Sequence, residues 1–161
     1  MSLDALSRQL WKQRETLEVV LFKLEEERLL VATGMARWLP RATAELEAVL
    51  NQAREQELER SMESEAAASA LGLEATASLQ DIAEAASEPW KTLLLQHRDA
   101  LVALTTEIGD TAQSNRQQLT MLQRATQETL MSIQESVGTY DQAGATSSFL
   151  GSGGRIVDES L

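Results

Sequence analysis

The sequence predicts an all-α protein, and three observations support this fold class. Leu, Ala, Glu and Gln, which favour helices, are abundant, whereas runs of β-branched residues are nearly absent. Of the 161 residues, 43% are hydrophobic but only 4% are aromatic, which is typical of aliphatic packing between helices. Apolar residues also recur at steps of three and four over long stretches. We therefore expect an elongated antiparallel helical bundle of three long helices plus one short helix, with a disordered C-terminal tail.

The composition excludes several classes of function. A net charge of −11 would repel nucleic acid and anionic membrane surfaces. The absence of cysteine excludes disulfides and thiolate metal sites, and it fits a reducing cytoplasm. No apolar run approaches the ~20 residues of a transmembrane helix, and the N-terminal segment lacks the apolar block of a secretion signal. We expect a cytoplasmic protein that neither binds nucleic acid nor inserts into a membrane.

Two long helices are expected in the first half of the chain. The apolar spacing predicts a helix over residues 3–32, which is interrupted at Gly34. Pro40 suits the first turn of a second helix, where its missing N–H needs no partner. That helix should end at Gly72, because glycine takes the left-handed conformation that is common just after a helix.

A short third helix and the longest helix follow. Ser78 and Asp81 form a start that resembles a capping box, which predicts the short helix. Ser87 and Pro89 then open the long helix as its cap and its early proline.

One apolar stripe follows the long helix at a mean spacing of about 3.6 residues. It comprises Trp90, Leu94, His97, Leu101, Leu104, Ile108, Ala112, Asn115, Leu119, Leu122, Thr126, Leu130, Ile133 and Val137. The stripe weakens between Gly109 and Gln118, which indicates either a water-exposed stretch or a hinge. We expect the helix to stop at Gly138, which gives a helical domain over residues 1–137 and a flexible tail over residues 138–161.

The side chains offer little chemistry. His97 is the only histidine and lies on the apolar stripe, which favours packing over catalysis. No cluster of His, Asp and Glu has the spacing of a metal site. The tryptophans Trp11, Trp38 and Trp90 lie at or near apolar stripes, which favours core packing over ligand stacking. We expect no enzymatic activity, no cofactor and no metal.

The second half of the long stripe is the most informative feature. It contains Leu119, Leu122, Leu130, Ile133 and Val137. Two helices of about 30 residues cover only part of a helix of about 48 residues. An uncovered stripe of this kind is a docking surface for a partner helix. Alternatively, the first two helices or a second copy of the chain cover it.

The order of these features resembles FlgN-type flagellar export chaperones, in an actinobacterial-like version. Four segments carry the resemblance: FKLEEERLLVATGMARWLPRATAELEAVL, SLQDIAEAASEPW, SNRQQL, and TYDQAG followed by GSGGRIV. It covers nearly the whole chain. It implies a cytosolic chaperone that binds the C-terminal helices of hook–filament junction (hook-associated) proteins, prevents their premature assembly and delivers them to the type III export gate. The implied partners are the junction proteins and the cytoplasmic domain of the export gate, with the export ATPase complex as a further candidate.

The resemblance also assigns residues. It places substrate capture on the last part of the long helix, which here comprises Leu119, Leu122, Thr126, Leu130, Ile133 and Val137. A tyrosine just beyond the helix is linked to docking on the export gate, and Tyr140 is the matching position. The family more often has glycine after that tyrosine, whereas this chain has Asp141.

Two rival functions belong to other classes. The chain could be a structural or regulatory coiled-coil homodimer with no export role, in which a second copy fills the stripe. It could also be a helical sensor or enzyme with a pocket near Trp90 and His97. A stoichiometric complex with a junction protein would favour the chaperone, a dimer without such binding would favour the coiled coil, and stabilisation by a small molecule would favour the sensor.

Overall fold

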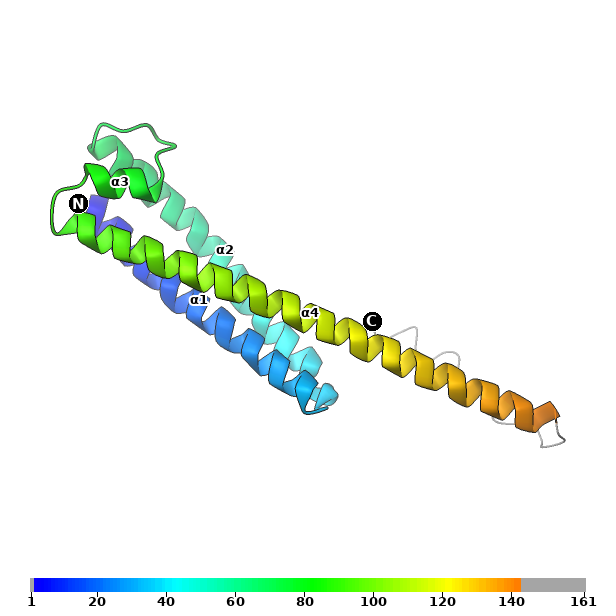
Figure 1. The fold of residues 1–161 in the computed structure, drawn as a ribbon. Helices are drawn as coiled ribbons and strands as arrows, with labels where there is room; N and C mark the ends of the chain where they lie inside the picture. The colour runs from blue at the N-terminus through cyan, green and yellow to red at the C-terminus, as the bar shows by residue number, and fades with distance from the viewer. Residues whose placement is uncertain (1, 143–161) are drawn as a thin grey trace. The chain divides into compact units, whose positions relative to one another are not determined.

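The computed structural model describes the backbone of residues 2–142 and the side chains of residues 2–135 (Figure 1). Its elements are α1 (Ser2–Ala32), the 3-10 helix η1 (Ala36–Trp38), α2 (Leu39–Ala70), α3 (Leu79–Ala85) and α4 (Trp90–Gln142). No strand occurs in this part of the chain, so the all-α prediction of three long helices and one short helix is confirmed. The predicted disordered tail beyond residue 142 lies outside the described residues.

The chain divides into two compact units, residues 1–118 and residues 119–161. The first unit holds α1, η1, α2, α3 and the N-terminal part of α4. The second unit begins with the C-terminal part of α4. The predicted boundary at residues 137 and 138 stays a prediction, and α4 runs through it.

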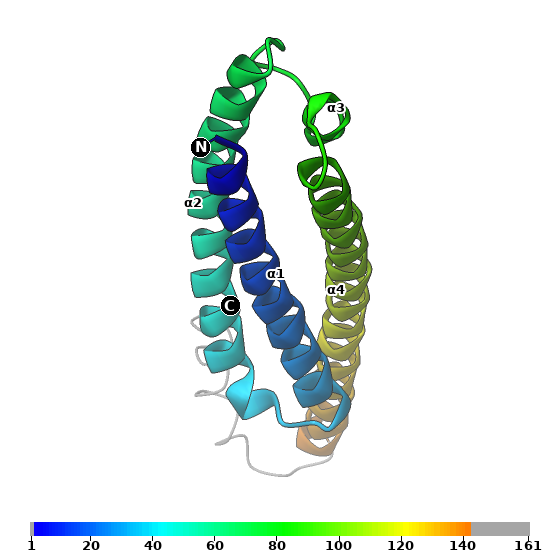
Figure 2. The same ribbon diagram turned by 90° about the vertical axis from the view of Figure 1, so that its left-hand side faces the viewer.

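Side-chain contacts in the first unit fix the directions of the helices. Lys12 Nζ lies 3.3 Å from Glu59 Oε2, and Lys23 Nζ lies 2.8 Å from Glu45 Oε2. Because the residue number rises on α1 as it falls on α2, these two helices are antiparallel. Figure 2 shows α2, α1 and the N-terminal part of α4 side by side.

The N-terminal part of α4 packs parallel to α1. Ser7 Oγ lies 3.3 Å from His97 Nε2, and Asn115 Nδ2 donates a hydrogen bond of 2.8 Å to the carbonyl oxygen of Leu24. Residue numbers therefore rise together on the two helices. Because α1 runs antiparallel to α2, the N-terminal part of α4 is also antiparallel to α2.

The sequence signals at the ends of the helices act as expected, with one exception. Gly34 and Gly72 have φ angles of +71° and +73°, the left-handed region where a Cβ would be strained. The hydroxyl of Ser78 accepts from the backbone N–H of Asp81, and the carboxylate of Asp81 accepts from the backbone N–H of Ser78, so the capping box is complete. Near the start of α4, however, the cap acceptor is Glu88: its Oε2 accepts from the backbone N–H and the hydroxyl of Thr92, a role that we had expected of Ser87.

Two apolar clusters form the core of the first unit. The first cluster joins α1, α2, α3 and α4, and its buried members are Leu6, Leu10, Ala67, Ala68, Ile82, Ala83, Ala86 and Leu94. The second cluster consists of the buried residues Val20, Leu24 and Leu46, with Val49, Leu50, Ile108 and Ala112 packed against it. The burial of Leu94 and the packing of Ile108 and Ala112 show that the apolar stripe of α4 faces the core in this unit.

Buried polar side chains separate the two clusters. We call Gln13, Thr16, Gln56 and His97 the polar layer; each is at most 9% exposed. The side-chain amide of Gln13 donates to Glu57 Oε2 over 2.6 Å. The Oε1 atoms of Gln13 and Gln56 are also buried. The layer therefore interrupts the apolar core in the middle of the unit.

His97 is packed in this layer in its neutral form. Its side chain is fully buried, and the ring of Trp11 meets it edge-on with ring centroids 4.9 Å apart. Arg14 Nη1 lies 3.4 Å from Nδ1, and a guanidinium can only donate, so Nδ1 accepts and the proton resides on Nε2, which faces Ser7 Oγ. Burial lowers the pKa of His97, and the positive charge of Arg14 lowers it further. The expected packing role of His97 is therefore confirmed.

Two expectations about α4 are wrong. The helix does not end at Gly138 but continues to Gln142, because one glycine costs a helix interior only about 1 kcal/mol. The stretch between Gly109 and Gln118 is not simply water-exposed, since Asn115 is 1% exposed and Ala112 packs on the second cluster. Whether this stretch acts as a hinge stays an open hypothesis.

His97 should make the stability of the protein depend on pH. The unfolded chain protonates His97 near pH 6.5, whereas the folded protein does so only at lower pH. The free energy of unfolding should therefore be highest above about pH 6.5 and fall as the pH is lowered through the folded pKa. Urea unfolding at about pH 7.5, 6.5 and 5.5 measures this, and His97→Gln should flatten the slope. An equal slope in both proteins would contradict the neutral, buried state of His97.

Candidate functional site

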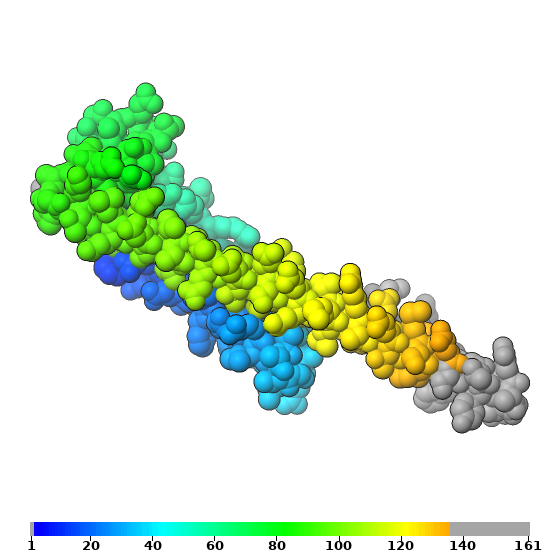
Figure 3. All heavy atoms as spheres, viewed as in Figure 1, coloured from blue at the N-terminus to red at the C-terminus, as the bar shows by residue number. Residues whose placement is uncertain are grey.

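The second unit presents an exposed helix. Every residue from 120 to 135 has an exposed side chain, and Leu119 is half-buried (Figure 3, yellow to orange). The exposed fractions of Leu122, Leu130 and Ile133 are 42%, 42% and 54%. Steps of three, eight and three residues place Leu119, Leu122, Leu130 and Ile133 on one face of α4. We call this face the leucine stripe.

Threonine on the stripe does not make it polar. The hydroxyl of Thr126 donates to the carbonyl oxygen of Leu122 over 2.9 Å, one turn back in the same helix. Thr129 does the same to the carbonyl oxygen of Ala125 over 2.8 Å. Their donors are therefore used within the helix, and Thr126 contributes chiefly a methyl group to the leucine stripe.

Two methionines extend the apolar surface beyond the leucine stripe. Met121 is 69% exposed and Met131 is 56% exposed. At about 100° per residue, both lie well outside the stripe, on other faces of the helix. Neither methionine follows the apolar spacing of the stripe, so that spacing does not predict them as part of the site. The signal that could have found them is the presence of two methionines on other faces of the same helix segment.

The structure places the backbone of the last two candidate positions. Val137 and Tyr140 both belong to α4. Gly138 had suggested that Tyr140 lies beyond the helix, but Tyr140 lies within its last turns. Their side chains lie outside the described residues. The roles of Val137 and Tyr140 therefore stay predictions.

The first unit has a separate apolar groove beside the turn from α1 to α2. It has a volume of about 580 Å³. Its lining residues are Glu26, Leu29, Leu30, Trp38, Arg41, Ala42 and Glu45. Leu29 and Trp38 are 59% and 46% exposed. Trp38 therefore lines an open groove and is not the core residue that we had expected, and Trp11, at 49% exposed, is not one either. Trp90 does pack against the first cluster.

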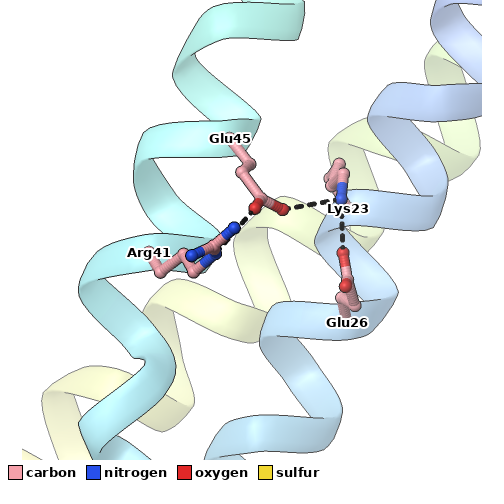
Figure 4. A network of polar contacts seen from close by, with 4 residues as sticks. All are labelled: Lys23, Glu26, Arg41 and Glu45. Carbon is pink, nitrogen blue, oxygen red and sulfur yellow. Dashed lines mark hydrogen bonds and ion pairs between the residues drawn. The ribbon is translucent and has the colours of Figure 1, made fainter.

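A charged network forms one edge of this groove (Figure 4). Lys23 Nζ lies 3.0 Å from Glu26 Oε2 and 2.8 Å from Glu45 Oε2, and Arg41 Nε donates to Glu45 Oε1 over 3.1 Å. The bond to Glu45, and then the bond to Glu26, raises the pKa of Lys23, while Lys23 and Arg41 lower the pKa of Glu45. The network ties α1 to α2, and its charges are satisfied within the chain.

No arrangement for catalysis or metal binding appears in the described part of the chain. Among these residues, no group of three or more His, Asp or Glu side chains could hold a metal ion. The pocket next to Trp90 is lined by Ser2, Leu3, Asp4, Ala70, Leu71 and Trp90, so His97 does not line it. This pocket therefore does not join Trp90 to His97, which the sensor hypothesis requires.

Comparison with known proteins identifies the family of the chain. A family model described as FlgN protein matches residues 1–148. The chain belongs to the FlgN family. This is a family of flagellar export chaperones and not of enzymes, which confirms the resemblance inferred from the sequence. No curated protein and no solved structure matches the chain. None of the described helices is long and apolar enough to cross a membrane.

The leucine stripe should contribute little to the stability of the free FlgN-family protein. Leu122→Asp and Leu130→Asp should each change the free energy of unfolding by less than about 0.5 kcal/mol, because both side chains are exposed. Leu94→Asp is the matched core control, since Leu94 is 0% exposed. This variant should lower the free energy of unfolding by more than the ~2–5 kcal/mol that is typical of a Leu→Ala change in a core. Urea unfolding followed by circular dichroism would test this. A large loss in the Leu122 and Leu130 variants would mean that the stripe is core.

Proposed function

We propose that this FlgN-family chain is a cytoplasmic chaperone that holds the C-terminal helices of hook-associated junction proteins on the leucine stripe of α4. One observation carries the proposal: a member of this family has an apolar helix face whose residues Leu122, Leu130 and Ile133 are each more than two-fifths exposed. Junction proteins assemble through their terminal helices, so these helices expose apolar stripes while they are free. A complementary stripe would cover them and prevent premature assembly.

Simple energetics indicate that the partner touches more than one face of α4. Burying the exposed remainder of one Leu or Ile side chain contributes on the order of 1 kcal/mol. The four residues of the leucine stripe then provide about 4 kcal/mol, whereas micromolar affinity needs about 8 kcal/mol. Met121 and Met131 supply further apolar area on other faces. We therefore expect two partner helices, or one bent helix, to enclose residues 119–135.

The methionines also suit a chaperone with more than one client. Methionine is unbranched and polarizable, so it adapts to partners of different shape. Leu122, Leu130 and Ile133 would anchor the helix of any client, while Met121 and Met131 would adjust to its sequence. This division would let one chain serve two different junction proteins.

Delivery needs a second contact, and we propose Tyr140 for docking on the cytoplasmic domain of the export gate. Tyr140 belongs to the last turns of α4, on the same helix as the leucine stripe. A client bound to the stripe would order this helix and hold the tyrosine in a defined position for the gate. An aromatic ring with a polar tip is also a common anchor of small interfaces. The export ATPase complex stays a candidate partner, to which no residue is assigned.

The alternative is a coiled-coil homodimer in which a second copy covers the leucine stripe. Two copies would each bring a net charge of −11, and this repulsion opposes their association. Analytical ultracentrifugation of the free chain would decide the point. A stable dimer that does not bind junction proteins would replace the chaperone proposal.

Client binding should depend on the leucine stripe. Leu122→Asp or Leu130→Asp should weaken binding to the C-terminal helical segment of a junction protein by at least about thirtyfold, because a carboxylate buried in an apolar contact costs about 2 kcal/mol or more. Gln113→Asp is the matched control, since it adds the same charge to an exposed position of α4 outside residues 119–135. Isothermal titration calorimetry measures all three affinities. Equal losses in all variants, or no loss at Leu122 and Leu130, would reject the stripe as the client site.

Holding and delivery should separate at Tyr140. Tyr140→Ala should keep client affinity within about threefold, near 0.65 kcal/mol, but weaken binding to the export-gate domain by about tenfold or more. Tyr140→Phe keeps the ring, so it should bind the gate more tightly than Tyr140→Ala. Titration of each variant with both partners gives the answer. Unchanged gate affinity in Tyr140→Ala would mean that another contact mediates delivery.

A further inference from the structure

We propose that Asn115 is a positioning residue that locks the register of α4 against α1 and thereby keeps Leu122 available for clients. The consequence for clients rests on the proposed function, whereas the lock itself rests on contacts within the first unit.

The repeat places one polar residue in an apolar series. Leu94, Leu101, Ile108, Asn115 and Leu122 follow one another at intervals of seven residues along α4. Leu94 is fully buried, Leu101 packs against the first cluster and Ile108 against the second. Residues seven apart occupy equivalent positions where two helices pack in parallel. A shift by one heptad therefore exchanges neighbouring members of this series.

Asn115 takes part in a polar network that joins all three long helices. Its Nδ2 donates to the carbonyl oxygen of Leu24 over 2.8 Å and to Glu27 Oε1 over 3.1 Å. Thr43 on α2 donates to the other carboxylate oxygen of Glu27 over 3.4 Å. Asn115 and Glu27 are only 1% and 7% exposed. The amide of Asn115 is thus the partner on α4 for a buried carboxylate on α1.

A shift of α4 by seven residues would remove this partner. In one direction Leu122 would replace Asn115, and in the other direction Ile108 would do so. Neither can donate a hydrogen bond, so the carboxylate of Glu27 would be buried against an apolar side chain, which is strongly unfavourable. His97 would also leave its contacts with Ser7 and Arg14. The network therefore selects the register in which Leu122 stays 42% exposed.

Leucine at both positions would remove the contribution of Asn115 and Glu27 to this preference. The variant Glu27→Leu, Asn115→Leu has an uninterrupted apolar seam between α1 and α4, and it leaves no buried charge without a partner. In the register with residue 122 inside the seam, Leu122 enters as Leu94 leaves, so this register buries as many side chains of the series as the native register and should become populated beside it. A single polar residue at such a position is a known means of fixing register in parallel helices.

A thiol at position 122 reports the register directly, because the chain has no cysteine. Leu122→Cys is introduced into the native chain and into the Glu27→Leu, Asn115→Leu variant, and its reaction rate with 5,5′-dithiobis(2-nitrobenzoic acid) is measured. The thiol should react about twofold more slowly in the double-leucine background, because it is covered only in the shifted register, while circular dichroism shows unchanged helix content. Gln113→Leu, which adds a leucine at an exposed position of α4, should leave the rate unchanged.

Equal rates in the native and double-leucine backgrounds would overturn the proposal, as would an equal decrease caused by Gln113→Leu. The thiol measurement uses no client, so it tests the lock separately from the client site. The same double-leucine variant, with Leu122 retained, is then titrated with a junction-protein helix. A slower thiol together with unchanged client affinity would uphold the lock and reject Leu122 as a client contact.

Discussion

The length of α4 is the constraint on which the rest of the structure depends. It has 53 residues, whereas α1 and α2 have 31 and 32. At about 1.5 Å per residue, α4 is some 80 Å long and its neighbours are close to 48 Å, so they cannot cover it completely. The apolar repeat nevertheless continues through Leu130 and Ile133. Because α4 is longer than α1 and α2, the rest of its apolar stripe is either covered by a partner molecule or exposed to solvent.

Buried polar groups interrupt the apolar core of the first unit, and the length of α4 gives a reason for them. A uniform leucine seam would pack in several registers, and each register would leave a different part of α4 exposed. The polar layer around His97 and the bonds from Asn115 to Leu24 and Glu27 give one register a clear advantage.

The positions of the helices could be predicted from local signals. The capping box at Ser78, the early Pro40 and the left-handed Gly72 each act within a few residues, so the sequence alone reveals them. The end of α4 could not be predicted in this way. Gly138 was read as a stop, but a single glycine lowers helix propensity too little to end a helix of this length.

Predictions about side-chain environment depended on tertiary packing and were less accurate. A polar stretch around Asn115 suggested exposure, yet the amide is buried because Glu27, 88 residues earlier in the chain, needs a donor. Trp38 lies near an apolar stripe but borders an open groove beside η1. The helix lengths, which the sequence contains, indicated that part of the leucine stripe could stay uncovered but left open whether the first two helices cover it, and Leu122, Leu130 and Ile133 are exposed.

The central claim is that α4 from residue 119 onward holds the client. Hydrogen–deuterium exchange of the free chain and of its complex with a junction-protein C-terminal segment tests it most directly, since it reports each part of the backbone in the intact chain. The account predicts that the client slows exchange in peptides covering residues 119–135 and leaves α1 and α2 nearly unchanged. Slower exchange confined to the groove residues around Leu29 and Trp38, with residues 119–135 unaffected, would contradict it.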